Sequence, residues 1–138
     1  MYYAKYFYAI FFIIAFFSCS NSKNTETVFT TSKELLEDVH DKKTFNNKYK
    51  NKDVFITGKV LYIGVPKDNP PNKNKTYVVI AEDDYSSVMI YFDFFINNFV
   101  IEEQDIIVQC RLRKIYKPYS LEKYYVEFKK GKLIQKLN

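Results

Sequence analysis

The stretch of sequence that most constrains the fold runs from Tyr49 to Gly64. Its residues alternate between two faces and are rich in β-branched and aromatic types, a pattern that is typical of a β-strand. One face of the pattern contains Val54, Ile56 and Val60. Gly58 interrupts the stretch near its middle. A lone glycine in a strand indicates a bulge or sharp bend, because it tolerates a positive φ and lets the strand coil from one sheet layer into another. The sequence therefore predicts one long, bent strand of the kind that begins a small curved barrel.

Residues 1–18 have the organisation of an export signal. One cation, Lys5, lies near the start, an uninterrupted apolar run follows at Phe7–Phe17, and small polar residues come after it. A basic start, a short apolar run and small residues at its end are typical of a secretory signal peptide. The run is shorter than the about 20 apolar residues that a membrane-spanning helix needs. We therefore predict a signal peptide at residues 1–18.

The four residues Phe16-Phe17-Ser18-Cys19 resemble the lipobox of bacterial lipoprotein precursors. A small residue precedes the cysteine as in that family, although a phenylalanine stands where an aliphatic residue is usual. The resemblance implies cleavage before Cys19, a lipid on its thiol, and a location in the cell envelope facing the periplasm or the exterior. The alternative is an ordinary secretory signal in which Cys19 is incidental.

A polar segment separates this leader from the folded domain. Residues 19–30 carry no periodic pattern and are predicted to be a flexible tether, with the domain at residues 31–138. Thr31 and Glu34 form a capping-box pattern, which favours the start of a helix. We predict one amphipathic helix over Ser32–Lys48, because its apolar residues recur at near-helical spacing. The apolar stripe, expected to lie against the sheet, consists of Leu35, Leu36, Val39 and Phe45.

Further strands follow the bent one. They are predicted at residues 76–81, 88–92, 105–116 and 124–128, with a bend at Gly131 and a last apolar pair at Leu133–Ile134. The first two of these strands are expected to form a hairpin across a polar turn. Residues 93–104 fit either a short helical segment or an irregular plug. Residues 65–75 contain three prolines and are predicted to form a long exposed loop.

The two cysteines do not suggest a disulfide. If Cys19 carries lipid, Cys110 has no partner within the chain. Cys110 lies in an alternating strand pattern and is expected to pack as a small hydrophobic side chain. In that strand the residues expected to share its face are Ile106, Val108 and Leu112.

The segment Tyr49–Val60, with the sequence YKNKDVFITGKV, resembles the opening strand of the tRNA_anti-like OB-fold family. In that family a helix ends in a tyrosine, a short basic turn follows, and an apolar strand contains a Thr-Gly-Lys-Val-like core. The likeness extends over roughly Ser32 to Ile134. It implies a mainly β fold, a five-stranded OB-fold-like barrel preceded by one amphipathic α-helix. For exported members of the family it implies a binding module without known catalytic residues.

Charge is distributed unevenly along the chain. The formal net charge is +5, and from Cys110 to Asn138 nine Lys or Arg residues are set against two Glu residues. Such asymmetry indicates a face that meets an anionic polymer or lipid head groups, although scattered lysines also occur on ordinary solvated surfaces.

The sequence offers little for catalysis. His40 is the only histidine and precedes Asp41, a pattern typical of a solvated surface pair, so we expect neither a metal site nor a cofactor. An alternative is a metal-dependent phosphodiesterase, but an acidic hairpin turn is the commoner explanation of its carboxylates. The residues of that alternative are Glu82, Asp83, Asp84, Asp93, Arg111 and Arg113. We therefore predict a protein that is not an enzyme.

The remaining hypothesis is a binding function. OB folds bind single-stranded nucleic acids by stacking bases on aromatic side chains and contacting phosphates with basic ones. The candidate ligand-binding residues are Tyr77, Tyr91, Arg111, Arg113, Lys129 and Lys130. Tyr77 fits the barrel interior equally well. We expect a membrane-anchored extracytoplasmic binding module whose partner is an envelope protein, a glycan or an anionic lipid, with single-stranded nucleic acid as the alternative.

Overall fold

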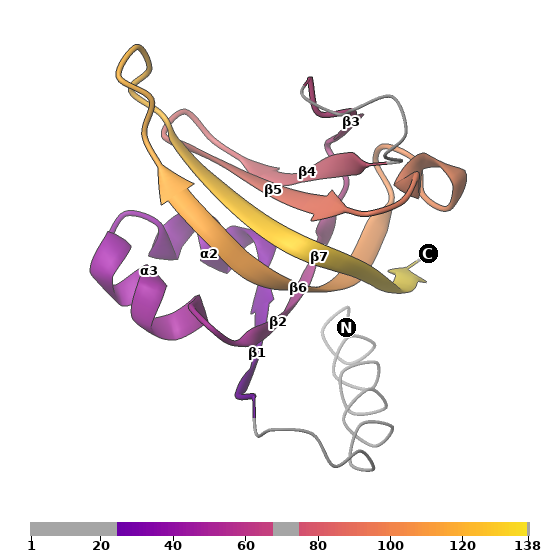
Figure 1. Ribbon diagram of the computed structural model, residues 1–138, viewed down its shortest axis with the longest axis horizontal. Coiled ribbons are helices and arrows are strands. Elements are labelled where there is room, and N and C mark those ends of the chain that lie inside the picture. Colours follow the sequence, from indigo (N-terminus) through magenta and orange to yellow (C-terminus); the bar gives the residue numbers. More distant parts are fainter. Residues whose placement is uncertain (1–24, 68–74, 138) are drawn as a thin grey trace, which may run out of the picture.

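The computed structural model describes residues 25–67 and 75–137 (Figure 1). The predicted signal peptide, Cys19 and residues 68–74 of the proline-rich loop lie outside the described residues. The fold is mainly β, as the sequence predicts. The strands are β1 (Thr27–Thr31), β2 (Asp53–Lys59), β3 (Tyr62–Gly64), β4 (Thr76–Glu82), β5 (Ser86–Phe92), β6 (Asp105–Tyr116) and β7 (Tyr124–Leu137). The helices are α2 (Ser32–Asp38), α3 (Lys42–Tyr49) and the 3₁₀ turn η1 (Ile96–Asn98).

All seven strands belong to one strongly curved mixed sheet in the order β1-β2-β6-β7-β5-β4-β3 (Figure 1). The β1–β2 and β5–β7 pairs are parallel and the other pairs are antiparallel. The helices α2 and α3 lie together on one side of the sheet, and the core fills the space between them and the inner face of the sheet.

The long strand predicted at Tyr49–Gly64 begins later and is divided. Tyr49 is the last residue of α3, and the chain leaves regular pairing at Val60, between β2 and β3. β2 pairs with β6, whereas β3 pairs with β4 at the other end of the strand order. The bend therefore follows Gly58 instead of coinciding with it.

Close packing, and not the predicted bulge, explains why a glycine stands at position 58. Its pairing with Ile106 is in regular register, and no glycine of the described residues has a positive φ. A Cβ atom at Gly58 would lie 2.8 Å from Cβ of Ser32 and 2.9 Å from Cγ1 of Ile80. The glycine thus permits the start of α2 and the strand β4 to approach the backbone of β2, and the prediction of a bulge at Gly58 was wrong.

β1 occupies part of the predicted tether. Residues 27–30 were expected to be flexible, but they form a strand that pairs in parallel with β2, with Val28 opposite Val54. The ring of Phe29 stacks on that of Phe55 with a centroid distance of 5.0 Å. The short apolar pair in this segment becomes ordered because β2 offers it an unpaired edge, a partner that local sequence does not reveal.

The single predicted helix is two helices. α2 ends at Asp38 and α3 begins at Lys42, because the side chain of Asp41 caps α3 and accepts hydrogen bonds from the backbone N–H groups of Lys43 (3.0 Å) and Thr44 (3.2 Å). These hydrogen bonds, together with one from the Thr44 hydroxyl, lower the pKa of Asp41.

The predicted capping box at the start of α2 is confirmed. The Thr31 hydroxyl oxygen accepts from the backbone N–H of Glu34 at 3.2 Å, and the Glu34 carboxylate accepts from the backbone N–H of Thr31 at 3.0 Å. The predicted apolar stripe also faces the sheet: Leu35, Val39 and Phe45 are buried, and Leu36 packs against the core.

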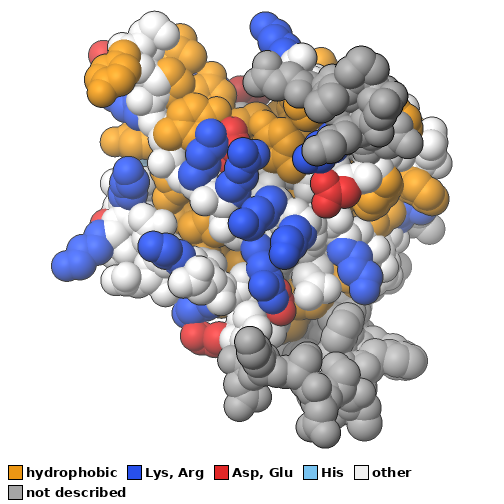
Figure 2. Space-filling view, viewed as in Figure 1, with side chains coloured by type: hydrophobic (Ala, Val, Ile, Leu, Met, Phe, Trp, Pro, Cys, Tyr) orange, Lys and Arg blue, Asp and Glu red, His pale blue; other side chains and the backbone are white. Residues whose placement is uncertain are grey.

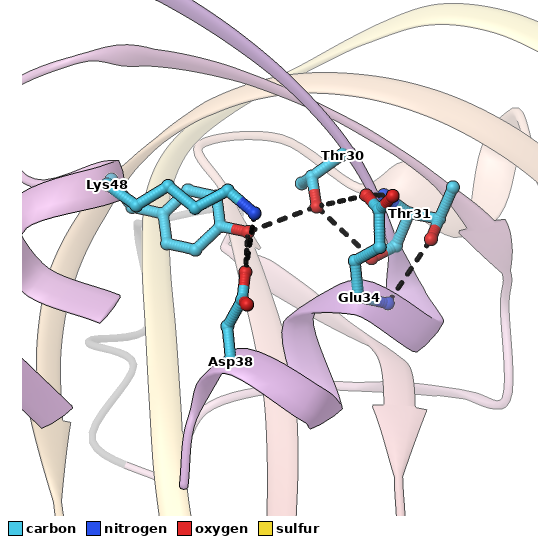
Figure 3. A network of polar contacts seen from close by, with 6 residues as sticks. Thr30, Thr31, Glu34, Asp38 and Lys48 are labelled. Carbon is cyan, nitrogen blue, oxygen red and sulfur yellow. Dashed lines mark hydrogen bonds and ion pairs between the residues drawn. The ribbon is translucent and has the colours of Figure 1, made fainter. Parts of the chain in front are cut away.

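A polar network joins β1, α2 and α3 around the buried Tyr49 (Figure 3). The Tyr49 hydroxyl donates to Asp38 at 2.5 Å, and it lies 3.1 Å from the hydroxyl of Thr30. Thr30 donates in turn to Glu34 at 3.0 Å, and Lys48 donates to Asp38 at 2.7 Å. Burial, followed by the hydrogen bond with Asp38, raises the pKa of Tyr49. The network satisfies the polar groups that lie at the junction of the three elements.

The remaining predictions on the domain agree with the structure in several places. β4 and β5 form the predicted hairpin, and β6 has the predicted bounds, with Ile106, Val108 and Cys110 in the core. The segment between β5 and β6 contains the short helical turn η1, whose Ile96 is buried. β7 extends well beyond the predicted 124–128 and continues through Gly131 to Leu137.

Candidate binding groove

An open groove of about 1210 Å³ lies on the outer face of the sheet. Strands β3, β4, β5, β6 and β7 all contribute to it, together with both described ends of the loop. Among the described residues, its ionisable lining consists of five tyrosines (Tyr62, Tyr77, Tyr91, Tyr116, Tyr125), six cations (Lys67, Lys75, Arg113, Lys114, Lys129, Lys130) and two carboxylates (Asp93, Glu127). Figure 2 shows Lys and Arg side chains gathered over the face formed by β6 and β7. The groove is therefore cationic and aromatic at once.

Three of the tyrosines form a row across β3, β4 and β5. The ring centroids of Tyr62 and Tyr77 are 6.2 Å apart, and those of Tyr77 and Tyr91 are 5.5 Å apart. Tyr77 and Tyr91 lie directly opposite each other in the β4–β5 pair, while the neighbouring Val78 and Ile90 point into the core. Tyr77 is thus on the groove side of the sheet and does not fill the interior. Burial, followed by the proximity of Tyr62, raises the pKa of Tyr77.

A second pair of rings lies along the β6–β7 ribbon. Tyr116 and Tyr125 are register partners, and their rings stack with a centroid distance of 5.5 Å and an interplanar angle of 22°. The ammonium of Lys114 lies 4.4 Å from the centroid of Tyr116, and the guanidinium of Arg113 lies 6.0 Å from that of Tyr91. Cations lie over aromatic rings in this part of the groove at distances where the two attract each other.

Glu127 lies beneath these cations. Glu127 is 4% exposed, and its Oε2 atom has no hydrogen-bond partner. The nearest charges are Arg113 Nη1 and Lys114 Nζ, each 3.6 Å from Oε2, which is an ion-pair distance but too long for a hydrogen bond. Burial, then hydrogen bonding to Glu127 and its charge, raise the pKa of Tyr116 to about 12. Burial and the charge of Glu127 likewise raise the pKa of Tyr91.

A β-bulge explains why two consecutive cations reach the same carboxylate. Leu112 pairs with Phe128 and Lys114 with Glu127, so Arg113 is an extra residue in β6. In a regular strand, neighbouring side chains would point to opposite faces. The bulge breaks this alternation and turns Arg113 and Lys114 toward one site.

Five of the six sequence-predicted binding residues line the groove: Tyr77, Tyr91, Arg113, Lys129 and Lys130. The sixth, Arg111, does not line it, since its Nε donates to Asp53 at 2.7 Å. Sequence reasoning missed Glu127 and Lys114, along with the three other tyrosines. Alternation along β7 would have placed Glu127 on the same face as Lys129, but the bulge that brings in Lys114 depends on cross-strand pairing.

The acidic residues of the phosphodiesterase alternative do not converge. Glu82 pairs with Lys123 at 2.6 Å, and Asp93 lies 3.9 Å from Lys75 in the groove. Asp83 accepts from the backbone N–H groups of Tyr85 (2.8 Å) and Ser86 (2.6 Å), so it stabilises the hairpin turn. Within the described ranges, no three His, Cys, Asp or Glu side chains are placed to hold a metal ion.

The two other residues considered for chemistry are His40 and Cys110. His40 is exposed, and its ring lies 6.0 Å from that of Tyr85. Cys110 is buried, burial raises the pKa of its thiol, and its Sγ lies 3.6 Å from the carbonyl oxygen of Val54. His40 is therefore a surface side chain, and Cys110 packs in the core as a small hydrophobic side chain.

No protein-family model matches the chain, and no curated protein matches it either. The resemblance of residues 49–60 to the tRNA_anti-like family therefore stays a prediction from sequence. In the part of the chain that the structure describes, no helix has the length and apolar character required to cross a membrane.

Proposed function

We propose that this chain is a non-catalytic binding module that holds an anionic ligand in the tyrosine-lined groove. The observation that carries the proposal is the row formed by Tyr62, Tyr77 and Tyr91 beside the cations of β6 and β7. Lys129 and Lys130 are exposed there, and among the described residues neither takes part in an ion pair. Cations that are not neutralised internally attract a ligand of opposite charge, and the rings give it a flat surface to pack on.

The proposal includes an OB-fold-like barrel. Two consecutive residues support it: the backbone N–H of Val60 donates to Gln104 at 2.9 Å, and that of Leu61 donates to Val79 at 2.8 Å. The chain segment containing β2 and β3 therefore bonds to the start of β6 on one side and to β4 on the other, as the first strand of a small barrel bonds to two different neighbours. The tRNA_anti-like resemblance of Tyr49–Val60 points in the same direction.

The proposal also includes export and lipid attachment at Cys19, for which the support is the leader at residues 1–18 and the lipobox-like Phe16–Cys19. A module tethered in this way works at the surface of a bacterial membrane. Its partners there are envelope molecules that carry negative charge: an anionic lipid, an acidic glycan or an acidic protein segment.

Single-stranded nucleic acid is the second candidate ligand, and the specific observation in its favour is that the tyrosine row lies next to the cations. Bases stack on aromatic rings while phosphates contact Lys and Arg, and such binding weakens steeply as salt rises. Oligonucleotide binding at low and at raised salt tests this candidate. If no salt-sensitive binding is detected, the candidate is eliminated.

The main proposal is tested with dextran sulfate, a soluble polyanion that contains neither lipid nor bases. The double variant Lys129→Glu/Lys130→Glu should weaken its binding to the full chain at least about tenfold, because both cations line the groove. The matched control is Lys33→Glu/Lys43→Glu, which makes the same charge change at exposed positions on α2 and α3. Equal losses in the two double variants would show that only net charge matters and would overturn the groove as the binding site.

A further inference from the structure

The carboxylate of Glu127 contains a buried oxygen that lacks a hydrogen-bond partner within the groove. Its side chain is 5% exposed, and Oε2 accepts no hydrogen bond although two cations lie 3.6 Å away. Buried carboxylate oxygens without a hydrogen bond are rare in folded proteins, because such an atom has lost water without gaining a donor. The Oε2 atom is therefore suited to receive a donor from outside the chain.

The cations above Glu127 indicate which chemical class of donor could bind to its Oε2 atom. Lys114 Nζ lies both 3.6 Å from Oε2 and 4.4 Å from the centre of the Tyr116 ring, and Arg113 lies over Tyr91. A carboxylate flanked by tyrosine rings attracts an ammonium group through charge and through the negative faces of the rings. Here the chain's own cations occupy that position.

Those two cations are free to move outward. The side chains of Arg113 and Lys114 are 51% and 49% exposed, so each lies half in solvent while Glu127 remains underneath. An anionic ligand in the groove draws them toward itself, because charge-assisted hydrogen bonds at about 2.8 Å are stronger than their present contacts at 3.6 Å. Glu127 would then be a buried charge without a cationic partner, which is unfavourable.

We propose that the groove selects an anionic ligand that also carries an ammonium group a few bonds from its phosphate or other anionic group. The anionic group takes Arg113 and Lys114, and the ammonium replaces them at Glu127 and between Tyr91 and Tyr116. Glu127 is then a specificity-determining residue: it disfavours plain anions and admits those that bring their own positive charge. The inference rests on the proposed function, since it assigns the ligand chemistry of the same groove.

The test compares phosphoethanolamine with ethyl phosphate, which has the same frame without the amino group. Both are titrated into the full chain in a nonionic detergent and followed by NMR chemical shifts. The unmodified chain should bind phosphoethanolamine about tenfold more tightly, since a hydrogen bond to a charged group has at least this effect. This comparison needs no variant, so it decides the question even if a substituted chain folds poorly.

Glu127→Gln supplies the second readout. It should weaken binding of phosphoethanolamine and leave ethyl phosphate bound equally or more tightly, because one negative charge is gone from beneath the cations. A residue with only a structural role would weaken both esters alike. The matched control is Glu122→Gln, which removes a charge at an exposed position outside the groove lining and should change neither affinity.

Equal binding of the two esters to the unmodified chain, or equal loss of both in Glu127→Gln, would overturn the inference. If neither ester binds while dextran sulfate still binds through Lys129 and Lys130, the inference fails and the proposed function stands. Loss of dextran sulfate binding as well would overturn both the inference and the proposed function.

A second experiment identifies the source of the ligand. It compares binding to phosphatidylglycerol vesicles with and without phosphatidylethanolamine. A Glu127-dependent gain with phosphatidylethanolamine indicates a lipid head group, whereas a preference limited to the soluble ester indicates a soluble ligand.

Discussion

Gly64 lies directly opposite Tyr77 in the β3–β4 pair, and a Cβ atom on Gly64 would lie 2.5 Å from Cζ of the Tyr77 ring. The glycine therefore leaves the space over which the central ring of the tyrosine row packs. Any side chain at this position would displace the ring from its place between Tyr62 and Tyr91.

This relationship predicts that Gly64→Ala destabilises the domain by about 1–3 kcal/mol, the usual cost of overpacking. Urea denaturation measures the change. In a Tyr77→Ala background the Tyr77 ring is gone, and the remaining close contact is with Cε1 of the half-exposed Tyr62 at 2.8 Å, so the same substitution should cost much less. A full cost retained in that background would show that Tyr77 is not the group displaced.

Asp41 provides a prediction for acid conditions. Its folded-state pKa is lowered from the ordinary value of 3.8, mainly by the hydrogen bond from the Thr44 hydroxyl. A carboxyl whose pKa is lower when folded stabilises the fold above its unfolded pKa, and this contribution is lost as pH falls through the folded value. Asp41→Ala should therefore lower Tm at neutral pH, with a smaller effect once the pH has fallen through the lowered folded-state pKa.

Asp41→Asn separates the cap from the charge. Asparagine also caps helices well, so this variant should keep most of the Tm at neutral pH while losing the acid-dependent part. A drop in Tm for Asp41→Ala that is the same at every pH would contradict the role assigned to the ionised carboxylate.

The helix break at Asp41 illustrates what sequence could and could not predict. Leu35, Val39 and Phe45 recur at spacings that suit a single helix, and all three are buried as that pattern predicts. Periodicity alone does not reveal that Asp41 restarts the helix. The signal was present, since aspartate is one of the preferred N-cap residues, but it competed with an unbroken apolar stripe.

Strands were predicted best where the sequence itself shows an apolar face. Ile106, Val108 and Cys110 of β6 share such a pattern and lie in the core, and the predicted bounds of the strand, Asp105–Tyr116, were correct. β1 was missed because its order depends on pairing with β2, which is distant in sequence. The site shows the same division: Tyr77 and Tyr91 were found from residue type, whereas the approach of Arg113 to Glu127 depends on a bulge that only cross-strand register defines.

Tyr49 should contribute to stability through its hydroxyl as well as its ring. Its hydroxyl donates to Asp38 and lies within hydrogen-bond distance of Thr30, and the residue is fully buried. Tyr49→Phe leaves these partners with an unmet hydrogen bond, at a cost of about 1–3 kcal/mol in the free energy of unfolding. Tyr62→Phe, which removes a hydroxyl from a residue that is 50% exposed, should be nearly neutral. Similar costs for the two variants in urea denaturation would argue against a structural network at Tyr49.

Tyr116 should titrate late, and Glu127 should be part of the reason. Its pKa is raised from the ordinary value of 10.0 to about 12, first by burial and then by hydrogen bonding to Glu127 and its charge. The folded state therefore favours the neutral phenol, so the resulting stabilisation is complete below about pH 10 and is lost as pH rises toward 12.

NMR measurements of the ring carbon resonances of Tyr116 across this pH range should show the late titration. Glu127→Gln should shift the Tyr116 titration to lower pH, because it removes a negative charge that lies close to this ring. An unshifted Tyr116 titration would mean that Glu127 does not act on this ring, and the arrangement of carboxylate and tyrosines at the base of the groove would need to be revised.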